Sequence, residues 1–348
     1  MNDQKIRELA QAVQHNCHVS DARHGADYSL CVYLMKMREY YRWEMGLPLG
    51  AVLPKDAVGD WLQAREQLWE ALEDADLQPI EVGGERFDPF DSEAINQRLE
   101  ADGLVYSGGL GSRAKPHFFL GRLEQHQRHG TYTVLVVAGE YARDLTAPPA
   151  MTLGDRIYLR RESLRRMLWE KLESWRWARP DNALGRAFAC YDFENDLDRS
   201  LDAMTEREIA AVLLHEQGEH EAGLRLGEDW NRMLLDLVHT PAELMARAVR
   251  DHLADCLSTL PALIATGDPA PLHFYMGNLS HMRKEIFPAL DRAYADWLAR
   301  GDTGALSEVA ASGREHWERV ALGMIACHRD DPAQAARGIQ RLVAESDL

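Results

Sequence analysis

The sequence predicts a mainly α-helical protein, a multi-helix bundle with a small antiparallel β insertion at about residues 80–145. Two observations support this fold class. From residue 161 to the end, apolar side chains recur at intervals of three and four residues, which is the period of an amphipathic helix. Between about residues 80 and 145 that period is lost, and glycines and prolines separate short runs rich in β-branched and aromatic residues.

The N-terminal part is predicted to contain three helices, at 3–16, 26–45 and 55–75. We expect a polar, histidine-rich loop at 15–25, between the first two. The second helix is apolar over most of its circumference, which is typical of an internal helix. Pro48 and Pro54 separate it from the third helix.

The β insertion is predicted from three strand-like runs, at 104–107, 117–124 and 131–138. Gly130 supplies a turn between the last two, so we expect an antiparallel sheet of two to four strands, with a helix at 91–101 beside it. Pro148 and Pro149 close this region. The glycine-rich stretch 107–112 is not followed by a helix, which indicates a hairpin or flexible loop and not a phosphate-binding loop.

The C-terminal half reads as one helix after another, at 161–178, 183–192, 205–226, 229–238, 241–265, 271–299, 304–328 and 331–345. Two starts carry capping patterns: Thr205 is followed by Glu208, and Thr240 is followed by proline at the first helical position. Glycines stand at three predicted C-terminal ends, Gly227, Gly267 and Gly301.

A length of 348 residues suggests about two domains. We expect N-terminal helices and a small α+β region over residues 1–150, and a helical bundle domain over residues 151–348. The sequence leaves open whether the N-terminal helices pack into the same core as the bundle.

The acidic net charge of the chain indicates which kinds of binding partner are not expected. The formal net charge is −17, from 39 basic and 56 acidic residues, so binding to nucleic acid or to anionic membranes is not expected. The densest basic patch, made by Arg160, Arg161, Arg165 and Arg166, is interpreted as a solvated helix face. The expected partner is an unidentified small molecule or protein, and the oligomeric state is unknown.

Cysteine usage and hydropathy point to the cytoplasm. No apolar run reaches the roughly 18–20 residues that span a bilayer, and residues 1–20 lack the features of a signal peptide. Five scattered cysteines with no C-x-x-C pair fit reduced thiols better than disulfides. We therefore expect a cytoplasmic protein.

The helix at 205–226 departs from an ordinary amphipathic pattern. At about 100° per residue, four ionisable side chains fall on the face that carries its apolar residues: His215, Glu216, Glu219 and His220. Glu208 falls on this face as well. Burying ionised carboxylates costs several kcal/mol each unless something compensates for their charge.

Three arrangements would compensate for these charges. A divalent cation would neutralise the carboxylates, arginines from neighbouring helices would pair with them, or the face would line a water-filled cleft. For the second arrangement, Arg38 and Arg42 are the candidate counter-ions of Glu216 and Glu219.

The spacing suits a metal ion, because residues i and i+4 share a helix face: His215 with Glu219, and Glu216 with His220. The pattern departs from the HExxH motif of zinc peptidases, since His220 comes one residue too late. It also departs from the Glu-x-x-His pattern of di-iron bundles, since Val212 stands three residues before His215. The mechanisms of these two families are therefore not transferred.

Other helices offer further candidates. On 241–265, His252 and Asp255 either complete the site or, in the case of Asp255, orient a ligand histidine through a hydrogen bond. His281 and Glu285 are i,i+4 partners, but they lie opposite apolar residues and are expected to be exposed. The predicted loop at 15–25 offers a second metal candidate, made by His15, Cys17, His18, Asp21 and His24.

The segment LLHEQGEHEAG resembles a family of uncharacterised bacterial proteins. The resemblance extends to RAVRDHLADCLSTLPAL, HFYMGNLSHMRKEIFPAL and NCHVSDARHGADYSLCVYLMKMREYYRWE, and it covers most of the chain. Such a family implies no activity to transfer, but the resemblance supports treating the HE-x-GE segment as a feature of interest.

The leading hypothesis is a metal-binding helical protein whose site is built by His215, Glu216, Glu219, His220, His252 and Asp255. As an enzyme it would use a single zinc ion to activate water, with Glu216 as general base, or a carboxylate-bridged pair of iron or manganese ions for redox chemistry. Ligands rich in oxygen favour iron or manganese. The alternative is a non-catalytic interaction or scaffold protein whose Glu/His cluster is a structural ion-pair network.

Overall fold

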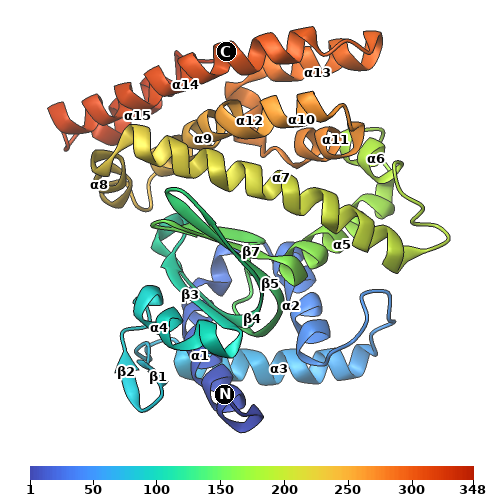
Figure 1. The fold of residues 1–348 in the computed structure, drawn as a ribbon, viewed down its shortest axis with the longest axis vertical. Coiled ribbons are helices and arrows are strands. Elements are labelled where there is room, and N and C mark those ends of the chain that lie inside the picture. The colour runs from blue at the N-terminus through green and yellow to red at the C-terminus, as the bar shows by residue number, and fades with distance from the viewer. The chain divides into compact units, whose positions relative to one another are not determined.

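The computed structural model describes residues 1–348, which divide into two compact units. Unit 1 comprises Met1–Gly111 and Lys115–Lys171, and unit 2 comprises Leu172–Leu348 with the short segment Ser112–Ala114. The mainly α-helical class is confirmed, but the protein is not a pure helical bundle, because unit 1 is built around a sheet (Figure 1).

Four helices precede or flank the sheet of unit 1: α1 (Asp3–His24), α2 (Leu30–Glu44), α3 (Lys55–Leu72) and α4 (Ser92–Leu99). The predicted loop at 15–25 is wrong, because α1 continues to His24. Its apolar face, Leu9, Val13 and Cys17, is buried in one cluster with residues of the sheet. Burial of this i, i+4, i+8 face stabilises the helix through a segment whose composition is otherwise polar.

The strands are β1 (Ile80–Val82), β2 (Glu85–Phe87), β3 (Leu104–Leu110), β4 (Pro116–His129), β5 (Tyr132–Arg143), β6 (Ala150–Leu153) and β7 (Arg156–Arg160). The first two form a small antiparallel sheet, and the other five form a sheet of order β3-β4-β5-β7-β6. Pairing is parallel between β5 and β7 and antiparallel elsewhere. The predicted insertion was therefore too small and wrongly all antiparallel, because the chain after Pro148 and Pro149 returns to the sheet.

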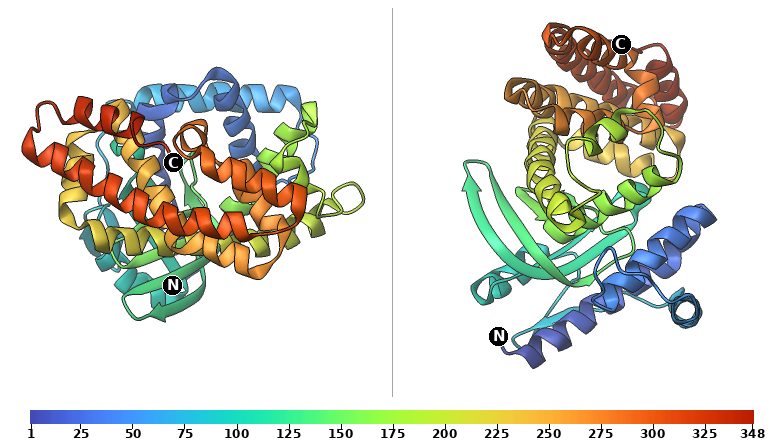
Figure 2. Two further views of the ribbon diagram at one scale, coloured as in Figure 1. Left: turned by 90° about the horizontal axis from the view of Figure 1, so that it is seen from above. Right: turned by 90° about the vertical axis from the view of Figure 1, so that its right-hand side faces the viewer.

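The five-stranded sheet is strongly curled (Figure 2). Register shifts along the β4–β5 pair, such as that between Leu120 and Gly121, are bulges that increase the local twist. The curl brings the two edge strands together, since a Cβ atom on Gly109 in β3 would lie 2.6 Å from Leu153 in β6. A larger residue at position 109 would force the Leu153 side chain to move.

Unit 2 is helical. Its elements are α6 (Ala183–Phe188), α7 (Leu197–Leu226), α8 (Glu228–Asp236), α9 (Pro241–Ala254), α10 (Leu260–Thr266), α11 (Pro269–Asn278), α12 (His281–Ile286), α13 (Pro288–Arg300), α14 (Gly304–Asp330) and α15 (Ala335–Ala344). The boundary between the units falls within α5 (Arg161–Ala178). One apolar cluster that includes Trp230, Phe287 and Trp317 forms the core of unit 2.

The predicted caps have mixed outcomes. Thr240 caps α9, and Gly227, Gly267 and Gly301 end their helices with positive φ, as predicted. The cap at Thr205 is wrong, because α7 begins earlier with Asp196 as its N-cap. The Thr205 hydroxyl instead donates to the carbonyl of Leu201 within the helix.

Two predicted helices are broken. The segment 271–299 forms three helices, because Ser280 caps α12 and Pro288 begins α13. The segment 241–265 is interrupted by a π-helical turn, η4 (Asp255–Thr259). Pro261 explains this turn, because its ring has no N–H and collides with the carbonyl four residues earlier, and a wider turn relieves that collision.

A close approach of two helices in unit 2 positions the candidate site. A Cβ atom on Gly218 in α7 would lie 2.2 Å from the carbonyl oxygen of Ala254 in α9. The two backbones can meet here only because residue 218 has no side chain. The contact brings His215 and Glu219, which are close to Gly218 along α7, next to α9.

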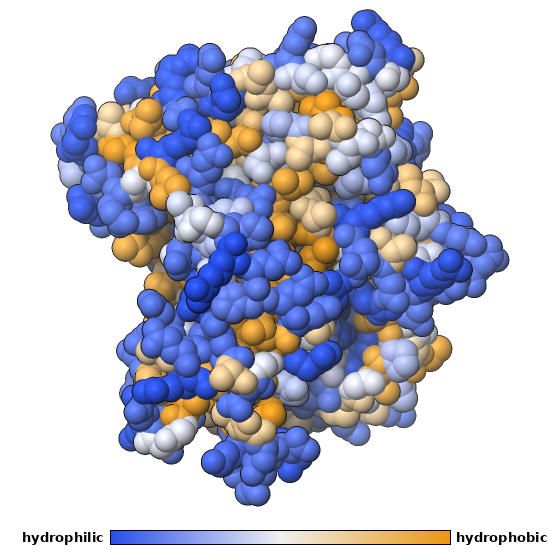
Figure 3. Space-filling model, in the orientation of Figure 1, coloured by the Kyte–Doolittle hydropathy of each residue, from blue (hydrophilic) through white to orange (hydrophobic).

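The visible surface is mostly polar. Hydrophilic residues cover most of the face shown in Figure 3, and they separate smaller apolar patches. None of the helices combines the length and the apolar character needed to cross a membrane.

Candidate functional site

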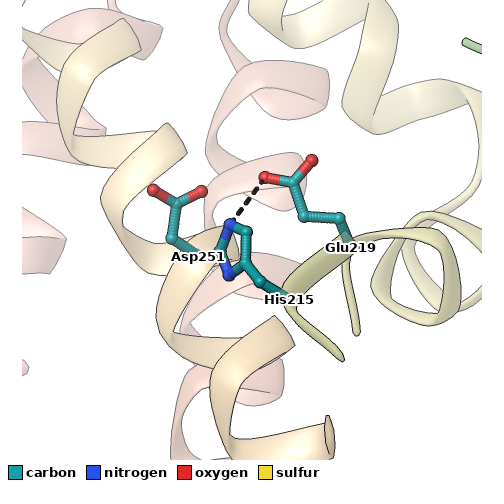
Figure 4. A group of neighbouring side chains, drawn as sticks. All are labelled: His215, Glu219 and Asp251. Atoms are coloured by element: carbon teal, nitrogen blue, oxygen red, sulfur yellow. Dashed lines mark ion pairs between the residues drawn. The ribbon is translucent and has the colours of Figure 1, made fainter. Parts of the chain in front are cut away.

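Three side chains in unit 2 lie close enough together to hold a metal ion: His215 and Glu219 from α7 and Asp251 from α9 (Figure 4). One ligand atom from each residue lies within 4.8 Å of the others. The His215 Nε2 and Glu219 Oε1 atoms are 3.5 Å apart. The side chains are 27%, 17% and 26% exposed, respectively, so an ion from solvent can reach them.

Asp255 orients the histidine. Its Oδ1 accepts a hydrogen bond of 2.8 Å from Nδ1 of His215, which directs Nε2 to the other two ligands. Its Oδ2 accepts hydrogen bonds from the Tyr275 hydroxyl, at 2.9 Å, and from Arg283. A carboxylate on the distal nitrogen of a ligand histidine is the usual arrangement around protein-bound metals, because it fixes the tautomer and raises the basicity of the ligand.

The charges of the cluster shift its pKa values in opposite directions. Burial disfavours the charged form of His215, but the Asp255 and Glu219 carboxylates outweigh this and raise its pKa well above the usual value. Burial would raise the pKa of Glu219, but Arg250 and His215 outweigh it and lower that pKa. Burial raises the pKa of Asp251, and the nearby Glu219 carboxylate adds to this effect. Two carboxylates this close favour an added positive charge between them.

Arginines already compensate for part of the charge. Arg250 Nη2 lies 2.6 Å from Glu219 Oε1 and 3.6 Å from Asp251 Oδ1, while Arg283 contacts Asp255. The counter-ions predicted from the sequence are elsewhere: Arg38 and Arg42 both contact Glu39 in unit 1. The arrangement thus contains elements of both the metal hypothesis and the ion-pair hypothesis.

His252 supports the cluster from behind. It is fully buried and stacks on Trp317, with ring centroids 5.1 Å apart. Nδ1 accepts a hydrogen bond from Arg283 Nη2 at 3.3 Å, and Nε2 donates to the Arg283 carbonyl at 2.9 Å. Burial and the charge of Arg283 lower the pKa of His252 to about 3, so the ring is neutral. Both ring nitrogens are occupied, and His252 positions Arg283 in this structure.

The other predicted ligands lie outside the three-residue group. Glu216 is buried next to His215, and His220 follows Glu219, but neither belongs to the group. His281 and Glu285 form an exposed pair 3.2 Å apart, as predicted.

Arg250, Tyr275 and Arg283 were not predicted as members of the site, and Asp251, at the edge of the apolar face of 241–265, was not predicted as a ligand. Asp251 and Asp255 stand at i and i+4, a spacing that marks them as a pair on one helix face. Arg283 was missed because 271–299 was treated as one helix with a single phase. The cap at Ser280 and the proline at 288 are the signals that would have corrected this phase.

The residues of the second predicted metal site lie at separate positions along α1 and bind different partners. Cys17 Sγ donates to the Phe118 carbonyl, and His18 accepts from Arg65. Asp21 accepts from Lys115 Nζ at 3.2 Å and from the Leu145 amide at 2.8 Å. These side chains do not meet at one point, and the group that could hold an ion is the one in unit 2.

Asp21 gives a pH-dependent prediction. Burial raises its pKa to about 6, although Lys115 opposes the shift, whereas in the unfolded chain it titrates near about 3.9. The folded state therefore holds an extra proton between these values, and stability from this group is lost as the pH rises from about 4 to about 6. We expect Asp21→Asn to gain stability relative to the wild type over this interval, by up to about 3 kcal/mol. Urea denaturation at each pH measures the difference.

The neighbouring carboxylate provides the control for this prediction. Asp144 is equally buried, but His117 and Lys115 outweigh burial and lower its pKa. Asp144→Asn should show a smaller gain between pH 4 and 6 than Asp21→Asn, because wild-type Asp144 stays ionised across the interval and its loss acts only by lowering the pKa of Asp21. Parallel pH profiles for wild type and Asp21→Asn would contradict the assignment.

Comparison with known proteins finds one family. The model of an N-terminal domain matches residues 8–160, and the model of a C-terminal domain from the same family matches residues 165–346. Both are described as domains of a family of unknown function, which confirms the resemblance to an uncharacterised family. No curated protein and no solved structure matches the chain.

Proposed function

The chain belongs to the family of unknown function DUF6866, and we propose from its site that unit 2 binds a single divalent metal ion through His215, Glu219 and Asp251. The observation that carries this proposal is the convergence of three ligand atoms within 4.8 Å, with the histidine oriented by the buried Asp255.

To hold an ion, the three ligand atoms must move closer together and Arg250 must give up its contact with Glu219 Oε1. Ligand atoms about 2.0–2.2 Å from a metal ion lie roughly 3–3.5 Å from one another. The His215 Nε2 and Glu219 Oε1 atoms, 3.5 Å apart, are already near this spacing. Three protein ligands support one ion and leave coordination positions open. An ion with open positions polarises a bound substrate or lowers the pKa of bound water, which is the chemistry we propose for this site.

The donor set favours some metals over others. One imidazole nitrogen with two carboxylate oxygens suits manganese, iron and zinc, and the oxygen-rich character favours manganese or iron. Glu216, buried beside His215, stays a hypothesis as general base. The bacterial origin and the cytoplasmic location expected from the sequence also stay predictions, and the partner stays a small molecule or a protein.

Metal content tests the proposal. Protein purified without a metal-affinity tag should carry near-stoichiometric metal by plasma mass spectrometry, or take up Mn²⁺ or Zn²⁺ after dialysis. Glu219→Gln keeps the side-chain volume and removes the charge, so we expect it to lose the ion. Glu221→Gln is the matched control, because Glu221 is on the same helix but pairs with Arg225 at the surface. The control should keep the ion.

A double variant separates the two ligand sets. If His215, Glu219 and Asp251 hold the ion, Glu216→Ala/His220→Ala retains metal. If the ligands are those first predicted from the sequence, this variant loses metal. Absence of metal from the wild type after incubation with each ion would refute the proposal.

One observation favours a second candidate, the structural ion-pair network. Arg250 already lies 2.6 Å from Glu219, and an arginine that stays there competes with a metal ion. In that case no variant contains metal, and Glu219→Gln is destabilised, by up to about 3–5 kcal/mol, because Arg250 loses the nearer of its two carboxylate partners. The protein would then be an interaction or scaffold protein.

A further inference from the structure

A pocket of about 230 Å³ in unit 1 is lined by an excess of positive charge. It lies where α2 ends and α5 begins, and its charged residues are Arg42, Arg165, Arg166 and Glu162. Three guanidinium groups against one carboxylate are unusual in a chain with 39 basic and 56 acidic residues. We propose that this pocket binds the phosphate group of a small phosphorylated molecule.

The arginines of this segment are not a solvated helix face. Arg160 is 1% exposed and Arg166 is 7% exposed, which corrects the interpretation made from the sequence. Arg160 forms a two-bond ion pair, since its Nε and Nη2 donate to the two oxygens of Glu140 at 2.8 and 2.9 Å, although its buried Nη1 has no acceptor. Arg166 makes only one hydrogen bond to a carboxylate, that of Glu162, and it lines the pocket.

One donor of Arg166 lacks an acceptor. Its Nη2 donates to Glu162 at 3.1 Å and its Nη1 makes a long contact of 3.4 Å with the Glu39 carbonyl, while its buried Nε has no acceptor. Burial and the neighbouring charge of Arg143 lower the pKa of Arg166. A buried cation with an unused donor and a like charge nearby is stabilised by an anion, so Arg166 points to a ligand of negative charge.

Arg42 gives the pocket a fixed wall. Its Nε donates to Glu39 at 3.1 Å, and its Nη1 donates to the carbonyls of Pro48 and Ala51 at 2.7 and 2.9 Å. These bonds hold both the guanidinium and the loop 46–49 that lines the pocket. The hydrogen bonds from Nε and Nη1 leave Nη2 for a ligand. A group held in advance loses little conformational entropy when a ligand binds.

Glu162 does not neutralise the pocket. One of its oxygens accepts from Arg166, and the other accepts from the Glu140 amide at 3.0 Å. The lining holds three guanidinium groups and one carboxylate, and Glu39, which pairs with Arg42, is the only other carboxylate that contacts Arg42. Positive charge is therefore in excess at the pocket, which suits a phosphate group. Guanidinium groups bind phosphate oxygens through paired, charge-assisted hydrogen bonds. The volume admits the phosphate and a few further atoms.

Binding of inorganic phosphate to the full-length protein tests this proposal. Isothermal titration calorimetry at low ionic strength is carried out after chelator treatment, so that no metal ion contributes and the result is independent of the site in unit 2. Arg165→Gln should weaken phosphate binding about tenfold or more, the effect of one charge-assisted hydrogen bond. Arg166→Lys keeps the positive charge but removes the planar guanidinium group that donates paired hydrogen bonds, so it should also weaken phosphate binding. Circular dichroism shows whether each variant is folded.

Arg161→Gln is the matched control. Arg161 is on the same helix and contacts Glu124 at 3.0 Å, but it does not line the pocket, so this variant should bind phosphate like the wild type. Three results would overturn the proposal: no phosphate binding by the wild type, equal binding by Arg165→Gln and Arg166→Lys, or succinate binding as tightly as phosphate. Phosphorus NMR line broadening on the wild type decides the first point without any variant.

Discussion

Replacing Asp255 by alanine is expected to lower the free energy of unfolding by about 3–5 kcal/mol. Asp255 is 1% exposed, and its two oxygens bind His215, Tyr275 and Arg283. Its removal leaves the Arg283 guanidinium without its carboxylate, and an unpaired, largely buried charge is the main source of the loss. Urea denaturation followed by circular dichroism measures the change.

Two milder variants separate the contributions at Asp255. Tyr275→Phe removes one of the three hydrogen bonds and is expected to cost about 1.5–3 kcal/mol, because the acceptor is charged. Asp255→Asn keeps the shape, and under the metal proposal it should weaken metal affinity about 10–100-fold by loosening His215. An Asp255→Ala variant no less stable than Tyr275→Phe would mean that Arg283 finds another acceptor.

Gly218→Ala is the second change for which we expect a large effect, a loss of about 3 kcal/mol. The added Cβ atom would lie 2.2 Å from the Ala254 carbonyl oxygen, and both atoms belong to helix backbones that cannot turn aside as a side chain does. Helices α7 and α9 must therefore separate, and packing beside the candidate site is lost. The midpoint of urea denaturation measures the loss.

The same helix provides an internal control for this substitution. Gly223 is exposed, and a Cβ atom there would meet nothing within 4 Å. Gly223→Ala should stabilise the protein by up to about 1 kcal/mol, because alanine is the better helix former. If both substitutions had the same sign, the close approach at Gly218 would not exist in solution.

The helical periodicity predicted which face of α7 carries the candidate site, but it did not predict which residues of other helices contact that face. At about 100° per residue, His215 and Glu219 were predicted to lie on the apolar face of the helix. The structure places both residues at the contact with α9. The pattern of one helix contains no information on which cation or carboxylate a second helix presents. Arg250 and Asp251 complete the cluster for that reason, and Arg38 and Arg42 do not.

Nonlocal pairing limited the fold prediction in the same way. The strands β3, β4 and β5 were anticipated because hairpins are local and leave turn residues such as Gly130 in the sequence. The parallel pairing of β5 with β7 has no such signal, since it depends on contacts made after the chain has crossed β6. Pro148 and Pro149 were therefore interpreted as an end when they lie in a connection.

The π-helical turn η4 connects α9 to α10 without a loop and changes the direction in which the following side chains point. A wide turn contains one residue more than an α-helical turn, so the side chains beyond it are rotated by about 100° relative to an unbroken helix. The chain thus presents Asp251 and Asp255 to α7 and then buries Leu260 and Leu263 in the core. Pro261 thus gives this segment two differently oriented faces, and a transfer of the cluster to another helical scaffold that also keeps Leu260 and Leu263 in the core must carry that proline with it.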